Sequence, residues 1–167
     1  LVYFRDRTVL AAHSMPVGSL NLYRRFVNGI LPGKKELRAM REEVRQALKD
    51  VIPRSDCAAA TPLCGVGGTA RAAMALHAHW EKSPEHQEQY DTAFFSRVLH
   101  HAEKQPHKLM RDILKTAPER VHTLTPGILV LHTIAEFYRC PLIQPSPYGV
   151  REGYLSFILE KEGIPCD

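Results

Sequence analysis

Cysteine is scarce in this chain of 167 residues, and none of its cysteines stands in a C-x-x-C pair. Zinc knuckles and many redox sites depend on that spacing. We therefore predict neither a zinc site nor a disulfide framework, and the composition favours a reducing cytoplasm. The four cysteines are Cys57, Cys64, Cys140 and Cys166.

Long apolar runs are absent as well. No stretch approaches the ~20 apolar residues of a membrane-spanning helix, and no basic segment followed by an apolar one marks a secretory signal. We therefore expect a soluble protein without a membrane partner. The chain starts inside a β-prone run, residues 1–4, without an initiator Met. This start leads us to expect a segment cut from a larger protein.

Neither sign of charge dominates. Lys and Arg number 22 against 18 Asp and Glu, which gives a net charge of +4 and a pI of about 9.0. Such a balance favours anionic partners mildly and does not predict nucleic-acid binding. With 44% hydrophobic residues, the chain can bury one sizeable core. We predict a single domain over residues 1–167.

Histidine is frequent, but its spacing does not suit a metal. His77 and His79 are two residues apart and would not share a helix face. His100, Glu103 and His107 have helical spacing, yet a proline interrupts the helix that would align them. No Asp follows the His-His pair, which excludes an HD-type phosphohydrolase motif. We predict no metal bound by the side chains of this chain.

Two glycine-centred segments, residues 65–71 and 148–153, are the most informative features present. Each stands where an apolar strand is expected to give way to a helix. The lack of a Cβ atom at Gly67 and Gly68 would let one of them adopt a positive φ angle. It would also let backbone N–H groups and a helix N-terminus approach an anion. The pair of turns therefore predicts a phosphate or nucleotide site. A tight strand-to-helix turn without a ligand is the alternative.

The apolar pattern predicts strands first, then helices alternating with strands. A β-hairpin is expected from residues 1–4 and 9–12, and a surface loop over 81–91. This order predicts an α/β domain with a mixed sheet and flanking helices, in which ligands collect at the carboxyl ends of the strands. The other expected strands are residues 60–66 and 141–146. Helices are expected over residues 18–27, 35–51, 126–138 and 151–160. Three more are expected: one after the first glycine turn, one around 95–102 and one around 109–114.

The ordered set of motifs resembles the second domain of the Ppx/GppA family of exopolyphosphatases and guanosine-pentaphosphate phosphohydrolases. The resemblance implies a ribonuclease-H-like half-domain of the actin-like ATPase superfold, with a companion first domain across a cleft. It also implies hydrolysis of terminal phosphoanhydride bonds in polyphosphate or guanosine pentaphosphate, with magnesium. The motifs are Ser14 to Gly18, the Gly-Gly-Thr-Ala turn, Glu119-Arg120, Pro126 to Leu129 and the segment 146–153.

The resemblance also shows what this segment lacks. The family's general-base glutamate and both of its phosphate loops belong to regions that would precede Leu1. We therefore assign no catalytic residue and expect the isolated chain to be inactive. The family strand with the second phosphate loop would pair with residues 1–4. Its absence predicts either self-association as a homodimer through this edge, a rearranged hairpin, or an exposed apolar run.

Arg120 is the first candidate for phosphate binding, because a guanidinium offers a planar fork of donors to phosphate oxygens. The resemblance places it facing the polyphosphate cleft, and a solvated surface arginine is the alternative. His122 stands where many relatives carry an acidic residue, and its role stays open between a phosphate donor and a helix-entry residue. The other candidates are Gly67, Gly68, Thr69, Ser146 and Arg151.

Local structural roles compete with phosphate binding at several of these positions. Ser146 and Thr69 could each cap a helix, and capping is the favoured interpretation for Ser146. Arg151 and Glu152 would lie in the first turn of the last helix, where Glu suits the helix dipole and Arg can pair with another segment. We expect Gly149 and Gly153 to serve close packing. Two other functions stay open: a non-catalytic nucleotide- or alarmone-binding module, and a structural half-domain.

Overall fold

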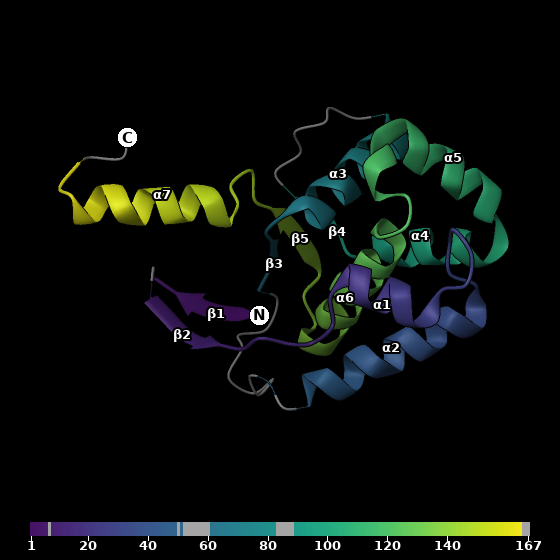
Figure 1. Ribbon diagram of the computed structural model, residues 1–167, viewed down its shortest axis with the longest axis horizontal. Coiled ribbons are helices and arrows are strands. Elements are labelled where there is room, and N and C mark those ends of the chain that lie inside the picture. The colour runs from purple at the N-terminus through teal and green to yellow at the C-terminus, as the bar shows by residue number, and fades with distance from the viewer. Residues whose placement is uncertain (7, 50, 52–60, 83–88, 165–167) are drawn as a thin grey trace.

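The chain forms a helical body with two elements standing beside it. The computed structural model describes residues 1–6, 8–49, 51, 61–82 and 89–164. Figure 1 shows the β1–β2 hairpin and helix α7 on one side of the body, which contains the other helices and a small sheet. None of the described helices has the length and hydropathy needed to cross a bilayer.

The hairpin is confirmed. Strand β1 (Val2–Arg5) pairs antiparallel with β2 (Thr8–Ala12) in a two-stranded sheet of its own. Val2 and Phe4 remain more than half exposed, at 55% and 58%. The apolar run of residues 1–4 is therefore exposed in the single chain, and self-association through this edge stays a prediction.

The second sheet joins segments that are distant in sequence. Strand β5 (Leu142–Pro145) lies in its centre, parallel to β3 (Leu63–Gly65) and antiparallel to β4 (Tyr90–Asp91). The mixed sheet is confirmed. Within the described residues β3 starts later than expected, and position 60 of the predicted strand lies outside them.

The expected loop over 81–91 is wrong at both of its described ends. Helix α3 (Gly68–Glu81) extends to Glu81, and Tyr90 and Asp91 form a strand. Tyr90 is only 4% exposed, because its ring stacks on His77 and meets Phe94 edge-on. A strand of two residues has no periodicity to detect, so only this tertiary packing defines it. Residues 83–88 of the expected loop lie outside the described ranges.

Helix α6 (Leu124–Tyr138) is the centre of the body and packs against α1, α2, α3 and α4. Most of its residues are buried, as its nearly continuous apolar sequence predicts. It begins before Pro126, whereas the sequence suggested a start at that residue. A first-turn proline needs no backbone donor, so the helix accommodates it. The surrounding helices are α1 (Ser19–Phe26), α2 (Lys34–Leu48), α4 (Ala93–Lys104) and α5 (Pro106–Thr116), with a 3₁₀ turn η2 (Pro118–Arg120).

Helix α7 (Val150–Lys161) differs from the other long helices because none of its residues is buried. Four of its apolar side chains, those of Val150, Tyr154, Leu155 and Phe157, are exposed to solvent. Val150 is 83% exposed, Tyr154 66% and Phe157 59%. A helix this apolar needs a partner surface that the described residues do not supply.

Candidate phosphate site

The two glycine turns meet at one edge of the sheet. Strands β3 and β5 are parallel neighbours, so their carboxyl ends lie side by side. The backbone N–H of Ser146, just after β5, donates to the carbonyl of Gly65 at 2.9 Å. The structure therefore joins segments 65–71 and 146–153 at the position where α/β sheets usually bind ligands.

Gly67 has a backbone conformation that other residues rarely adopt. Its φ angle is 108°, and it is the residue immediately before α3. Only glycine reaches this region without strain, because a Cβ atom would collide with the local backbone. The expectation of a positive φ in this turn is confirmed at Gly67.

Gly68 makes room for Arg120. A Cβ atom placed on Gly68 would overlap Nη2 of Arg120 and would lie 3.0 Å from its Nε. Arg120 ends the turn η2, and its Nε is 3.6 Å from Oε1 of Glu119. The Arg120 side chain is 34% exposed, so its guanidinium covers the first residue of α3 while staying open to solvent. Two predicted site residues, Gly68 and Arg120, are therefore in contact.

The first turns of three helices converge beside this contact. A Cβ atom on Gly127 of α6 would lie 2.5 Å from Cγ2 of Thr69 in α3 and 3.3 Å from Cβ of Ser19 in α1. None of these helices has an acidic residue in its first turn or a side chain that caps it. Their partial positive charges are thus uncompensated by the described residues, which makes the region attractive to anions.

Thr69 occupies this helix junction rather than an open surface. Its methyl group faces the Cα of Gly127, and its hydroxyl oxygen would lie 3.0 Å from a Cβ there. The side chain is half-buried. The contact explains why small residues stand at both positions, and it fixes the spacing between the two helices.

Ser146 and Glu152 make local hydrogen bonds, but only Glu152 closes a helix end. The capping role expected for Ser146 is wrong, because Tyr148 lies before α7 and the N-cap of that helix is Gly149. The hydroxyl of Ser146 accepts a bond from the N–H of Tyr148 at 3.2 Å. Oε2 of Glu152 accepts a bond from the N–H of Gly149 at 2.7 Å, which closes the N-terminus of α7. These bonds from its own backbone and from Gly149, with the nearby charges of Arg71 and Arg151, lower the pKa of Glu152.

Arg151 and Gly153 do not join the Gly68–Arg120 contact in the part of the chain described. Arg151 lies exposed in the first turn of α7. The packing role expected for Gly153 is wrong, since a Cβ there would meet no atom within 4 Å. Gly149 is tighter, because its Cβ would lie 3.0 Å from Oε2 of Glu152.

Comparison with known proteins identifies the family of this chain. The sequence profile of the Ppx/GppA phosphatase family matches residues 1–162. The chain belongs to the Ppx/GppA family. A search of curated protein sequences found no match.

Solved structures of Ppx/GppA proteins share the fold. A family member from Aquifex aeolicus is 19% identical with a TM-score of 0.78, covering 98% of this chain and 53% of that one. An exopolyphosphatase from Cytophaga hutchinsonii is 20% identical with a TM-score of 0.68, covering 98% of this chain and 54% of that one. This α/β chain, with its mixed sheet and flanking helices, therefore has the fold that the resemblance implied. It spans about half the length of these relatives.

His122 lies beside α1. Its ring packs against Tyr23 with centroids 5.0 Å apart and remains exposed. Tyr23 was not among the predicted site residues, because only the fold brings α1 next to the segment after Arg120.

No group of three potential metal ligands occurs among the described residues of this Ppx/GppA chain. His77, one of the histidines considered above, is a core residue whose ring packs between Tyr90 and Phe94. Burial lowers the pKa of His77, which favours its neutral form.

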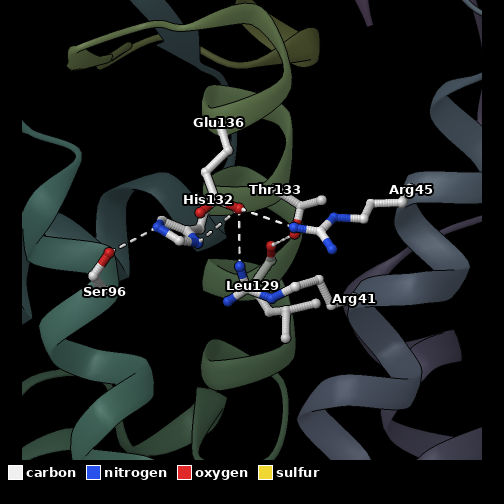
Figure 2. A network of polar contacts seen from close by, with 7 residues as sticks. All are labelled: Arg41, Arg45, Ser96, Leu129, His132, Thr133 and Glu136. Atoms are coloured by element: carbon white, nitrogen blue, oxygen red, sulfur yellow. Dashed lines mark hydrogen bonds and ion pairs between the residues drawn. The ribbon is translucent and has the colours of Figure 1, made fainter.

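A second polar cluster lies further along α6, and sequence reasoning missed it (Figure 2). Nε2 of His132 is 2.8 Å from Oγ of Ser96 on α4, and its Nδ1 is 3.7 Å from Oε2 of Glu136. Glu136 also accepts a hydrogen bond from Nη1 of Arg41 on α2 at 2.9 Å and lies 3.9 Å from Nη2 of Arg45. The cluster connects α4, α6 and α2, and burial lowers the pKa of His132.

Proposed function

We propose that this chain is the second domain of a phosphohydrolase that releases orthophosphate from polyphosphate or guanosine pentaphosphate. The observation that carries the proposal is the guanidinium of Arg120 lying over Gly68, where the first turns of α1, α3 and α6 meet. Backbone donors and an arginine together suit the oxygens of a phosphate group. This wall would hold the phosphate chain while water attacks the terminal phosphorus in line.

The attack needs a general base, and the described carboxylates at the site have other tasks. Glu119 neighbours the guanidinium of Arg120, and Glu152 accepts the N–H of Gly149. The lowered pKa of Glu152 makes it a weak base. We therefore propose that the base comes from a companion domain of the same polypeptide, as the family resemblance implies.

A groove beside the hairpin supports the idea of a companion. It has a volume of about 540 Å³ and lies between the edges of β1 and β3, which pair with no further described strand. Its lining is mainly apolar and includes Val2, Phe4, Leu63 and Val66. We propose that the companion part of the longer protein fills this groove and covers the exposed face of α7. A second copy of the chain is the alternative occupant.

Magnesium belongs to the proposal for the whole enzyme only. The described residues gather no group of three ligands, and the carboxylates near Arg120 are engaged as stated above. The described side chains do not form a magnesium site, so we assign no step to the ion in this chain.

A non-catalytic alarmone-binding module is the second candidate. The exposed ring of His122 beside Tyr23, two positions after Arg120, favours it because such a ring can stack on a nucleobase. This function would require nucleotide binding without phosphate release.

The test measures phosphate release by the full-length protein with polyphosphate and with guanosine pentaphosphate. Arg120→Ala should lower kcat/KM about tenfold to a hundredfold, which corresponds to a charge-assisted hydrogen bond of roughly 1.5–3 kcal/mol. The matched control is Arg38→Ala, which changes an exposed arginine on α2. Figure 1 shows this helix at the edge of the body away from α3. Equal activity of both variants would reject the role of Arg120. Binding of guanosine pentaphosphate without any hydrolysis would favour the alarmone module.

A further inference from the structure

Arg71 connects the two glycine turns. It is the fourth residue of α3, and its backbone N–H donates to the carbonyl of Gly67 at 3.3 Å. Side chains on a helix lean toward its N-terminus, which directs Arg71 back over the first turn. Its Nη1 lies 4.0 Å from the position that a Cβ on Gly149 would occupy. A side chain from the first turn thus reaches the second.

The N–H donors of the Arg71 guanidinium are not used by the described residues. The residue is exposed, and within the described ranges no hydrogen bond or ion pair engages its side chain. The carboxylate of Glu152 is nearby, but its Oε2 already accepts the N–H of Gly149 at 2.7 Å. The fork of N–H groups on Arg71 is therefore open to a ligand.

The dipole of α3 disfavours a cation at Arg71, and the nearby carboxylate of Glu152 offsets this in part. A cation near the N-terminus of a helix opposes the helix dipole, and α3 has no acidic residue in its first turn to offset it. Arg120 brings a second cation to the same turn, at Gly68. Each arginine has one carboxylate nearby, Glu119 at Arg120 and Glu152 at Arg71, and an anionic ligand would stabilise both guanidinium groups further.

We propose that Arg71 is a second phosphate-binding residue of this site, so that Arg120 and Arg71 hold different phosphate groups of one polyphosphate chain. This inference rests on the proposed function. Arg120 lies against Gly68 and Arg71 against Gly149, so the two guanidinium groups serve two separate turns. In this proposal Arg120 holds a phosphate near the end of the chain, and Arg71 holds one that lies beyond the reach of tripolyphosphate. Arg71 therefore contributes to selectivity for chain length.

The experiment compares steady-state kinetics of the full-length protein on tripolyphosphate and on long-chain polyphosphate. Arg71→Ala should raise KM for the long chain about tenfold, as expected for loss of one charge-assisted hydrogen bond. It should change KM for tripolyphosphate less than about twofold and leave kcat within about twofold on both substrates. Arg71→Lys should recover part of the affinity, because it keeps the charge but loses the fork. Arg38→Ala again serves as the matched control.

The outcomes separate this inference from the proposed function. If Arg120→Ala impairs hydrolysis while Arg71→Ala behaves like Arg38→Ala on both substrates, the role of Arg71 is overturned and the proposed function stands. An equal rise in KM on both substrates also overturns the chain-length role. If the unmodified protein binds tripolyphosphate in a competition assay but hydrolyses neither substrate, the proposed hydrolysis fails. In that case the binding assay tests the two-arginine site: Arg71→Ala should weaken binding of long polyphosphate but not of tripolyphosphate, and equal binding of both by variant and parent would overturn it.

Discussion

Helices α6 and α7 are both rich in apolar residues, yet their surroundings are opposite. Leu124, Ile128 and Leu129 of α6 are 0% exposed, whereas Val150, Leu155 and Phe157 of α7 are at least 58% exposed. The difference shows that apolar composition predicts a need for burial but does not identify the partner. Four neighbouring helices cover α6, and within the described part of the chain no element buries a residue of α7.

The comparison is most directly tested by equal truncations in the two helices. Leu129→Ala should lower the free energy of unfolding by about 2–5 kcal/mol, because it leaves a cavity in a fully buried site. Leu155→Ala in α7, where the side chain is 58% exposed, should change it by less than about 0.5 kcal/mol. Urea denaturation of this chain measures both. A loss at Leu155 as large as at Leu129 would show that α7 is packed in solution.

A pair of glycine substitutions compares the body with α7 through smaller changes in stability. Gly67→Ala should cost about 1–2 kcal/mol of stability, since its φ of 108° is strained for any residue with a Cβ atom. Gly153→Ala lies within helix α7, with no atom near its Cβ position, and should stabilise the chain by up to about 1 kcal/mol. Thermal unfolding of both variants provides the measurement. Equal stability of Gly67→Ala and the parent would mean that this turn adopts another conformation in solution.

The weakest effect concerns His132, inside the body. Burial lowers its pKa in the folded state, partly against the pull of Glu136, and Arg41 and Arg45 lower it further. The unfolded chain therefore binds this proton more readily, and stability should fall as pH drops below about 6.5. His132→Gln should reduce that slope between about pH 7 and pH 5.

Part of the acid slope should remain in that variant, because burial also lowers the pKa of His77. The double variant with His77→Phe should reduce it further. Denaturant midpoints measured between about pH 7 and pH 5 give the dependence of stability on pH for each variant. If His132→Gln had the same dependence as the parent, His132 would not be a buried neutral imidazole in the folded protein.

Local sequence signals predicted the elements whose structure depends on nearby residues. The helical spacing of Leu37, Met40 and Val44 predicted the buried face of α2, and all three are at most 5% exposed. The glycine pattern predicted the strained turn at Gly67. These features follow from periodicity and backbone sterics alone.

Features made by distant segments could not be predicted in this way. The strand at Tyr90 exists because its ring packs on His77 and its backbone meets Ile143. The Ser96–His132 bond joins residues on different helices, and so does the stacking of Tyr23 and His122. No local pattern marks such pairs, so tertiary packing decides them. The contact of Gly68 with Arg120 lies between these cases, since both residues were candidates but only the fold shows that they touch.

That contact also links substitutions at positions 68 and 120. The space above Gly68 is filled by the guanidinium of Arg120, so a side chain fits at position 68 only if the arginine moves or is replaced. A substitution at position 68 should therefore displace the Arg120 guanidinium from the start of α3 even in a sequence that keeps the arginine, so the two positions are coupled through the place of that group.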